Sequence, residues 1–469
     1  MKLWSKKLGW IYWGVFATAM TIYFAISITS ANQMLFMPGV TSHGHYQIEL
    51  ACKACHESPF GGKEALQKSC VKCHGKELKT ADDKHPKSKF TDPRNAARVA
   101  KLDARYCITC HVEHKPEITA NMDVTVANDV CYLCHYDIAK DRPSHKGMAF
   151  TTCNNAGCHN FHDDRALYED FLDKHLDEPV DLAAQLVKQR SPAAMLAKLG
   201  GYPLQNYPLR PLNPGEQDAP ADLAKEQQVL QEWHDTAHAK AGVNCSACHK
   251  TEDKDKHLVW ITKPKYEICK KCHKPEVTGF LQGKHGMRLA QGLPPMTPAQ
   301  ARLPMRKKSS DKQLTCATCH GAHRFDTVYA AVDACLSCHE DDHSLAYKNS
   351  PHFRLWQKEV YGQIAKNSGV SCATCHLPRE IHKNDGKEII TTQHNQNDNL
   401  RPNEKMLRSV CMYCHGLGFS IDALADTELV NKNFTGKPSR HIESLDMAKR
   451  RLLLKRKKDN GGGTGTEKI

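Results

Sequence analysis

Residues 245–273, CSACHKTEDKDKHLVWITKPKYEICKKCH, contain the pattern Cys-x-x-Cys-His twice. The pattern occurs ten times in the 469-residue chain, and an eleventh copy, CNNAGCH at residues 153–159, has four residues between its cysteines. Numbered along the chain, motifs 1 to 5 are Cys52/Cys55/His56, Cys70/Cys73/His74, Cys107/Cys110/His111, Cys131/Cys134/His135 and Cys153/Cys158/His159. Motifs 6 to 11 are Cys245/Cys248/His249, Cys269/Cys272/His273, Cys316/Cys319/His320, Cys335/Cys338/His339, Cys372/Cys375/His376 and Cys411/Cys414/His415.

The spacing within each motif suits covalent attachment of a porphyrin. Residues i and i+3 lie on one face of a helical turn, so two thiols at this spacing can reach the two vinyl groups on one porphyrin edge. The histidine at i+4 shares that face and can bind the iron. In motif 5 the extra residues must bulge outward, which Asn154, Asn155 and Gly157 tolerate. We therefore predict eleven covalently attached c-type haems, bound by all 22 cysteines, with the eleven motif histidines as proximal iron ligands.

Three other uses of paired cysteines are zinc sites, iron–sulfur clusters and disulfides. Zinc and iron–sulfur sites need cysteine pairs but no histidine directly after the second cysteine. Histidine makes up 28 of 469 residues, yet it follows the second cysteine in all eleven copies. Disulfides would not impose one short spacing throughout the chain. Covalent haem therefore explains the pattern best.

Seventeen of the 28 histidines lie outside the motifs. His114, His162, His323 and His343 closely follow a motif and are well placed to reach a neighbouring haem. We expect two histidine ligands at most irons, and such saturated irons exchange electrons without binding substrate. Met34, Met37 and Met148 are alternative ligands, although packing at the membrane edge or in the core is the favoured interpretation of each. The predicted distal ligands are His43, His45, His85, His114, His145, His162, His234, His238, His285, His323, His343, His352, His382 and His394.

The composition supplies few side chains for an ordinary core, with 7% aromatic residues and a mean hydropathy of −0.58. Haems would then fill the interior. We predict a mainly α fold with long irregular loops packed around a haem chain, plus one N-terminal transmembrane helix. A gap of 90 residues separates His159 from His249. The predicted parts are an anchor with a short linker (1–42), a pentahaem domain (43–165), a helical and proline-rich linker (166–230), a hexahaem domain (231–425) and a basic tail (426–469).

The N-terminal segment from Leu8 to Ile28 carries no charge over 21 residues, about the length that spans a bilayer. Lys2, Lys6 and Lys7 precede it, so the positive-inside rule places the N-terminus in the cytoplasm. We predict a single anchor in the bacterial inner membrane, with the bulk of the chain in the periplasm. The competing interpretation is a signal peptide that is cleaved near residues 29–31.

The formal charge of +13 raises the question of which partners the chain binds. Eleven ferric haems with two histidine ligands carry −1 each and would bring the total to +2. Most of the basic excess thus balances propionates, and we expect no nucleic-acid partner. The expected partners are the inner membrane, redox proteins and quinol. The basic helical pattern at residues 444–458 is either a solvated tail or a contact with anionic lipid or an acidic partner.

Longer segments of the hexahaem part resemble the octahaem hydroxylamine oxidoreductase family. The resemblance extends from Glu232 to Asp426 and rests on the order of the motifs, on the Ser-Pro-His segment at 350–352 and on the helical approach to motif 11. The strings that carry it are WHDTAHAKAGVNCSACH (233–249), CATCHGAHRF (316–325), CLSCHEDDHSLAYKNSPHFRLW (335–356), CATCHLPREIH (372–382) and NEKMLRSVCMYCHGLGFSIDAL (403–424). The pentahaem part resembles cytochrome c3-type modules, some of which have the longer spacing of CNNAGCH. The resemblance implies a multihaem cytochrome c.

This resemblance also limits the chemistry. Oxidases of that family have one substrate-binding haem, crosslinked to a tyrosine that follows the last motif, and the matching haem here would be that of motif 7. No tyrosine follows Cys414 in this chain, so the resemblance implies reductive rather than oxidative chemistry.

Two functions follow from the sequence. One is electron transfer between quinol or a membrane partner and a periplasmic redox partner. The other is reduction of a small nitrogen or sulfur oxyanion at one open haem, with His285 or His257 as a proton donor.

Overall fold

The computed structural model describes residues 2–29, 33–58, 61–142, 145–147, 149–150, 161–163, 169–184, 196, 205, 208–223, 225–384, 387–400 and 403–460. The chain divides into two compact units. The first comprises Met1–Thr80 and His85–Leu133, and the second comprises Ala81–Lys84 and Cys134–Ile469. Each unit is described here by itself.

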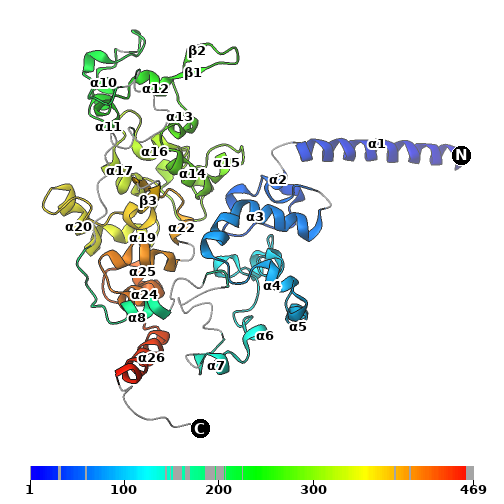
Figure 1. Cartoon of the computed structure of the whole chain (residues 1–469). Coiled ribbons are helices and arrows are strands. Elements are labelled where there is room, and N and C mark those ends of the chain that lie inside the picture. Colours follow the sequence, from blue (N-terminus) through cyan, green and yellow to red (C-terminus); the bar gives the residue numbers. More distant parts are fainter. Residues whose placement is uncertain are drawn as a thin grey trace. The chain divides into compact units, whose positions relative to one another are not determined.

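The first unit begins with α1 (Lys2–Thr29), a long helix at the N-terminal end of the chain (Figure 1). Its segment Leu8–Ser27 is long and apolar enough to cross a membrane, as an anchor or as a signal sequence. The apolar side chains of this segment are exposed, as expected of a helix that faces lipid. The remaining helices of the unit are α2 (Cys52–Cys55), α3 (Gly62–Ala81), α4 (Lys87–Thr91) and α5 (Ala96–Val99), with short 3-10 turns between them.

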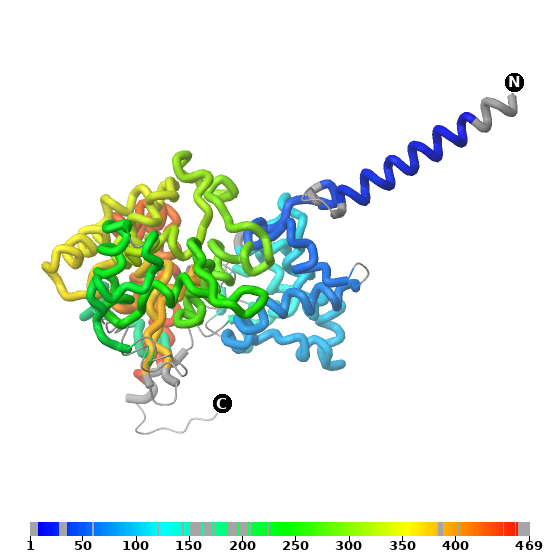
Figure 2. Tube along the Cα trace, turned by 90° about the horizontal axis from the view of Figure 1, so that it is seen from above, coloured from blue at the N-terminus to red at the C-terminus, as the bar shows by residue number. Residues whose placement is uncertain are grey.

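The second unit consists of short helices joined by long loops (Figure 2). After α6 (Tyr132–His135), at the boundary, come α7 (Ile138–Asp141), α8 (Glu169–His175), α10 (Gln227–His234), α11 (Ala237–Lys240), α12 (Cys245–His249), α13 (Tyr266–Lys270), α14 (Lys274–Gln282), α15 (Met287–Ala290) and α16 (Cys316–His320). The later helices are α17 (Thr327–Ala331), α18 (Asp333–Leu336), α19 (Asp342–Ala346), α20 (Pro351–Val360), α21 (Cys372–His376), α22 (Asn397–Leu400), α23 (Met406–Ser409), α24 (Leu417–Ala425), α25 (Thr427–Asn431) and α26 (Glu443–Asn460).

Strands are few in the described residues. Strand β1 (Lys250–Glu252) pairs antiparallel with β2 (Leu258–Trp260), and β3 (Arg379–Asn384) pairs antiparallel with β4 (Lys387–Thr392). Each pair is a separate hairpin, so no larger sheet organises the described chain. The prediction of a mainly helical fold with long loops and one N-terminal helix of membrane-spanning length is confirmed.

The largest apolar cluster lies in the second unit. Leu407 and Leu417 are almost completely buried there, and α8, α23, α24 and α26 contribute the surrounding side chains. The core is thin, because the largest fully buried side chains of the described structure are Leu407, Leu417, Val332 and three serines. The short helices therefore gain little from side-chain packing alone, as the composition predicted.

The structure also tests the helical patterns outside the motifs. Of the predicted helical stretch 166–199, residues 169–175 form α8, residues 177–184 form turns and extended chain, and most of 185–199 lies outside the described residues. The basic pattern near the C-terminus is helical, as α26. Its Leu445 and Leu452 are buried, which places the helix against the second unit. The five-part division of the chain stays a prediction.

Replacing Leu417 with Ala is expected to destabilise the second unit, because Leu417 has 0% relative exposure in the main cluster. The loss should be about 2–5 kcal/mol, and the thermal midpoint followed by far-UV circular dichroism should fall accordingly. Leu453→Ala is the matched control, since Leu453 is 56% exposed, and it should stay within about 0.5 kcal/mol of the parent protein. Equal midpoints for the two variants would contradict this account of the core.

Candidate haem-binding sites

Most described motifs adopt a single helical turn. The motif histidine donates its backbone N–H to the carbonyl oxygen of the first cysteine in motifs 1, 3, 7, 9 and 11, over 2.8–2.9 Å. Motifs 6, 8 and 10 coincide with the helices α12, α16 and α21, and motif 2 lies within α3. In two of these helices a side chain caps the first turn: Asn244 accepts from the N–H of Cys245, and Ser371 accepts from that of Thr374. The turn places both thiols and the imidazole on one side, as the spacing predicted.

All twenty described cysteines are free thiols. A disulfide framework is therefore absent from the described part of the chain. Cys153, Cys158 and His159 of motif 5 lie outside the described residues.

The described thiols are not equally accessible, although the sequence assigns all of them the same role. Cys52 and Cys73 are exposed, Cys338 is buried, and the other seventeen are half-buried. In motif 2, Cys73 lies on a solvent-facing part of α3, and its charge when ionised raises the pKa of the nearby Cys55 thiol, after the larger effect of burial. A porphyrin bound at motif 2 would therefore have to cover a side chain that the protein itself leaves open. Attachment at Cys73 stays a prediction.

Cys338 of motif 9 is the one buried thiol among the described cysteines, with a relative exposure of 8%. The segment before α16 pairs with the backbone of this turn: the Arg306 backbone N–H donates to the carbonyl oxygen of Cys338, and Met305 bridges His339. The Cys338 sulfur lies 3.5 Å from Oγ of Ser337. Haem attachment at Cys338 stays a prediction.

Seven motif histidines face a second histidine ring. In the first unit His74 faces His45, with ring centroids 5.9 Å apart. In the second unit the six histidines of motifs 6 to 11 are paired in this way: His249 with His323 (5.8 Å), His273 with His238 (6.0 Å), His320 with His394 (6.3 Å), His339 with His285 (6.3 Å), His376 with His343 (6.0 Å) and His415 with His352 (6.4 Å). Every second member of these pairs is one of the predicted distal ligands.

The separation of the rings fits an iron between them. A metal–nitrogen bond is about 2 Å long, and a ring nitrogen lies about 1 Å from its ring centre, so a metal with one imidazole on each side separates the centres by about 6 Å. The seven observed separations run from 5.8 to 6.4 Å. The pairs therefore have the spacing that two axial ligands of one haem require.

Hydrogen bonds orient the paired rings through their Nδ1 atoms. The Nδ1 atom of His249 lies 2.7 Å from the carbonyl oxygen of Ile261, and that of His394 lies 2.9 Å from that of Thr392. Because a carbonyl oxygen only accepts, Nδ1 carries the proton and Nε2 keeps its lone pair for a metal. His343 likewise donates through Nδ1 to the carbonyl oxygen of Val430, and the side-chain amide of Asn433 donates to its Nε2 over 3.3 Å. The proton position of these three rings is thus fixed by the fold.

In the first unit a carboxylate orients the distal ring. The Nδ1 atom of His45 lies 2.6 Å from Oε1 of Glu113, and the Ser42 backbone N–H also donates to Glu113. Burial raises the pKa of Glu113, but the hydrogen bonds from His45 and Ser42 outweigh it and bring the pKa to about 2. The carboxylate therefore stays ionised and holds the His45 ring beside His74.

Four paired histidines are neutral over the physiological range. Burial lowers the pKa of His285, His320, His352 and His376 to about 4, and a neighbouring imidazole lowers each further. A neutral imidazole is the form that binds a metal. These rings need not lose a proton before they can serve as ligands.

The thiols of successive motifs in the second unit lie near one another. The Cys269 thiol of motif 7 raises the pKa of the Cys316 thiol of motif 8, and the Cys372 thiol of motif 10 raises that of the Cys335 thiol of motif 9, because each pair of thiols lies close together. Burial raises the pKa of three further thiols, Cys248 to about 11 and Cys319 and Cys375 to about 12 each, and thiols of the next motif add to the shift. Motifs 6 to 11 therefore follow one another in space in the order of the sequence.

Several other predicted ligands lie elsewhere. His114 is hydrogen-bonded through Nδ1 to the carbonyl oxygen of Gly39, and His162 to Asp83. His234 forms an ion pair with Asp235, and His382 on β3 is hydrogen-bonded to Thr391. Two more have aromatic neighbours, His43 beside Tyr46 and His85 beside Phe90, and His145 lies in a short turn. Whether these rings bind an iron stays a prediction.

Three further motif histidines, two in the first unit and one next to the boundary, have other surroundings. His56 is exposed and has no histidine ring beside it among the described residues. His111 is hydrogen-bonded through Nδ1 to the carbonyl oxygen of Asp123, and His135 is exposed. Sequence reasoning predicted the motif ligands and the pool of distal candidates, but it did not predict which two rings meet.

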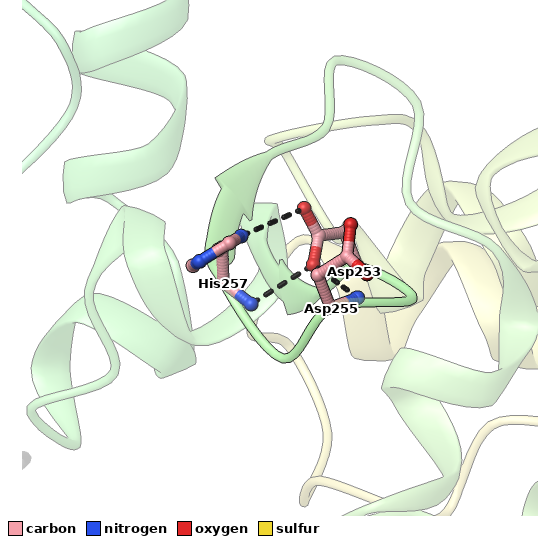
Figure 3. A group of neighbouring side chains, drawn as sticks. All are labelled: Asp253, Asp255 and His257. Carbon is pink, nitrogen blue, oxygen red and sulfur yellow. Dashed lines mark hydrogen bonds and ion pairs between the residues drawn. The ribbon is translucent and has the colours of Figure 1, made fainter.

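The hairpin tip after motif 6 gathers Asp253, Asp255 and His257 (Figure 3). Asp253 accepts hydrogen bonds from the backbone N–H groups of Asp255 and His257, and its carboxylate lies 3.6 Å from Nδ1 of His257. All three residues are exposed. His257 thus belongs to a solvent-facing turn and not to one of the histidine pairs.

One comparison with known proteins covers the first four motifs. Residues 44–136, which contain motifs 1 to 4, match the model of the cytochrome c3 family. No curated protein matches the chain. A cytochrome c3 domain binds c-type haem covalently and transfers electrons, so the matched region supports a multihaem cytochrome c.

Replacing His238 with Ala is expected to open one axial position at motif 7, because His238 is the ring that faces His273. The oxidised protein should then gain a high-spin ferric signal in electron paramagnetic resonance (EPR) that the parent lacks at that haem. His257→Ala is the matched control, since this exposed histidine lies in no pair. A high-spin signal in the control, or none in His238→Ala, would contradict the assignment.

The planes of the paired rings predict two kinds of low-spin spectrum. His238 and His273 are nearly perpendicular, at 88°, whereas His249 and His323 are nearly parallel, at 14°. Perpendicular ligand planes leave two iron d orbitals close in energy and widen the g anisotropy, and parallel planes separate them. His238→Ala should therefore remove a highly anisotropic low-spin signal, and His323→Ala a rhombic one. Loss of the same signal in both variants would refute these geometries.

Proposed function

We propose that this protein is a membrane-anchored undecahaem c-type cytochrome of the bacterial periplasm. Electrons pass from quinol or a membrane partner, through its haems, to a periplasmic redox partner. When bound, c-type haem supplies a one-electron couple at each iron. The chain's own residues hold each haem through two thiols, fill its axial positions and set the distance to the next one.

The six histidine pairs of the second unit carry this proposal. Each motif from 6 to 11 has a second imidazole at the separation that a bound iron requires. An iron with two imidazole ligands has no position left for substrate, so it changes its charge without changing its ligands. That is the behaviour expected of an electron carrier rather than of a catalytic centre.

The order of the thiols supports a relay within the second unit. Because the cysteines would mark one edge of each porphyrin, the closeness of Cys269 and Cys316 would bring two haem edges together. The closeness of Cys335 and Cys372 would do the same for motifs 9 and 10. The chain therefore supports an unbranched path that runs through motifs 6 to 11.

Contacts near the N-terminus support an anchor that is retained. Phe36, which follows the segment where a signal peptidase would cut, lies against Phe24 of α1 with ring centroids 6.1 Å apart. Leu35, Phe36 and Val40 are exposed and extend the apolar surface of α1 beyond its end. Exposed apolar side chains next to a spanning helix suit the membrane interface.

The reductase alternative has less support from the second unit. The haem that would bind substrate, by the resemblance to the hydroxylamine oxidoreductase family, is that of motif 7, and His238 stands opposite its proximal His273. Of the two proposed proton donors, His285 is paired with His339, and His257 lies at the exposed hairpin tip. The family resemblance of this part is retained only as a proposal about its haem arrangement.

Mass spectrometry and ligand binding test the proposal together. The mature protein should exceed the polypeptide mass by eleven haems, and nitrite, hydroxylamine and sulfite should leave the absorption bands of motifs 6 to 11 unchanged. His238→Ala serves as the positive control, because it opens an iron to such ligands. A mass increase far below eleven haems, or ligand-induced band shifts in the parent as large as those of the control, would refute the proposal.

A further inference from the structure

Lysines gather around motif 7. Lys263, Lys265, Lys270, Lys271 and Lys274 are all exposed, and Glu267 is the one exposed acid between residues 263 and 274, so this segment has a net charge of +4. We call these five residues the motif 7 lysine surface. No ion pair or side-chain hydrogen bond is formed by these five lysines in the described structure. Their charge therefore faces solvent.

The motif 7 lysine surface lies at the cysteine side of two haem sites. Lys270 and Lys271 stand between the cysteines of motif 7, and the other five motifs of the second unit have no charged residue in that position. Burial raises the pKa of the Cys248 and Cys272 thiols, and the charge of Lys271 opposes the rise at both. Lys271 is thus near the thiols of motifs 6 and 7 at once.

Lysines beside the cysteines of motifs 6 and 7 would lie far from the propionates of the haems bound there. The vinyl groups that react with cysteine and the propionates lie at opposite edges of the porphyrin, so lysines beside the cysteines do not neutralise the propionates of those haems. Within residues 263–274 the large apolar side chains Tyr266 and Ile268 are half-buried, so this segment itself exposes no large apolar side chain for insertion into a membrane. A haem bound at motif 7 would therefore have exposed lysines at its thioether edge.

We infer that the motif 7 lysine surface is the docking surface for an acidic electron-transfer protein, which meets the haems of motifs 6 and 7 at their thioether edges. This inference rests on the proposed electron-transfer function and adds the place and the charge of the partner. Opposite charges raise the rate of encounter and fix the orientation of the complex. Salt weakens such a surface because the lysines are exposed.

The neighbouring hairpin provides a matched control. Residues 250–257 carry three lysines and three acids, so their net charge is zero. Lys254 and Lys256 are exposed and two residues apart, as are Lys263 and Lys265. K263E/K265E and K254E/K256E therefore introduce the same change of charge with the same spacing, and neither alters a motif.

Binding of flavodoxin, a small acidic flavoprotein, to the full haem-loaded chain in nanodiscs is the test. Titration calorimetry should show an affinity that falls with added salt. K263E/K265E should weaken it by about tenfold or more, whereas K254E/K256E should change it by less than about twofold. Equal effects of the two variants, or an affinity that salt does not change, would overturn the docking surface. A third variant, K270Q/K271Q, should also weaken binding, with its haem content checked by absorption.

Stopped-flow reduction separates this inference from the proposed function. The anionic flavin hydroquinone of flavodoxin loses one electron to become the neutral semiquinone, and one ferric iron becomes ferrous. K263E/K265E should slow this step in proportion to its loss of affinity, while reduction by dithionite stays unchanged. An unchanged flavodoxin rate overturns the docking surface alone, whereas haems that dithionite does not reduce would refute the electron-transfer function itself.

Discussion

The separation of about 6 Å between paired imidazole rings is the constraint on which the second unit depends. One ring of each pair comes from a motif and is fixed by a helical turn. The other comes from a distant segment, and its Nδ1 is held by a backbone carbonyl or a side chain, as in His394 and His343. A bound iron would join the two segments, so each haem acts as a crosslink as well as a redox centre.

This constraint explains why so thin a core suffices. The fully buried side chains include as many serines as large apolar residues, and most helices are only one or two turns long. Such helices are marginal by themselves, because nucleating each turn costs more than its few hydrogen bonds return. Thioether bonds and iron–imidazole bonds at each site would supply the missing stabilisation, and the main apolar cluster around Leu417 adds to it near the C-terminal helices.

The local part of the site was predictable from the sequence, and the pairing was not. Two thiols and an imidazole at i, i+3 and i+4 define one turn, and motifs such as Cys372–His376 adopt it. His323 follows motif 8 but faces His249 of motif 6, and His343 follows motif 9 but faces His376 of motif 10. Which rings meet depends on the paths of long loops, and no local spacing specifies those paths. The excess of histidines left several choices open for each iron.

The exposure of individual thiols also could not be predicted from the motif sequence. Cys73 and Cys338 are both the second cysteine of a Cys-x-x-Cys-His turn, yet the first is open to solvent and the second is buried. The two turns also differ in their surroundings, because the backbone around Arg306 pairs with the Cys338 turn, whereas Cys73 lies within α3. A motif thus specifies the local geometry of its thiols, whereas the rest of the fold decides what covers them.

Basic residues near the motifs can have two roles that the net charge of the chain does not distinguish: balancing haem propionates and binding a partner protein. The overall excess of basic residues would balance the propionates of the predicted haems, which lie at one edge of a porphyrin. Lys271 acts on the thiols of Cys248 and Cys272, which would mark the opposite edge of the haems bound there. The charge of a lysine at that edge is not neutralised by the propionates of the adjacent haem. It therefore contributes to the electrostatic potential that attracts an acidic protein. The place of a positive charge relative to the cysteines therefore says more about partners than the net charge of the chain.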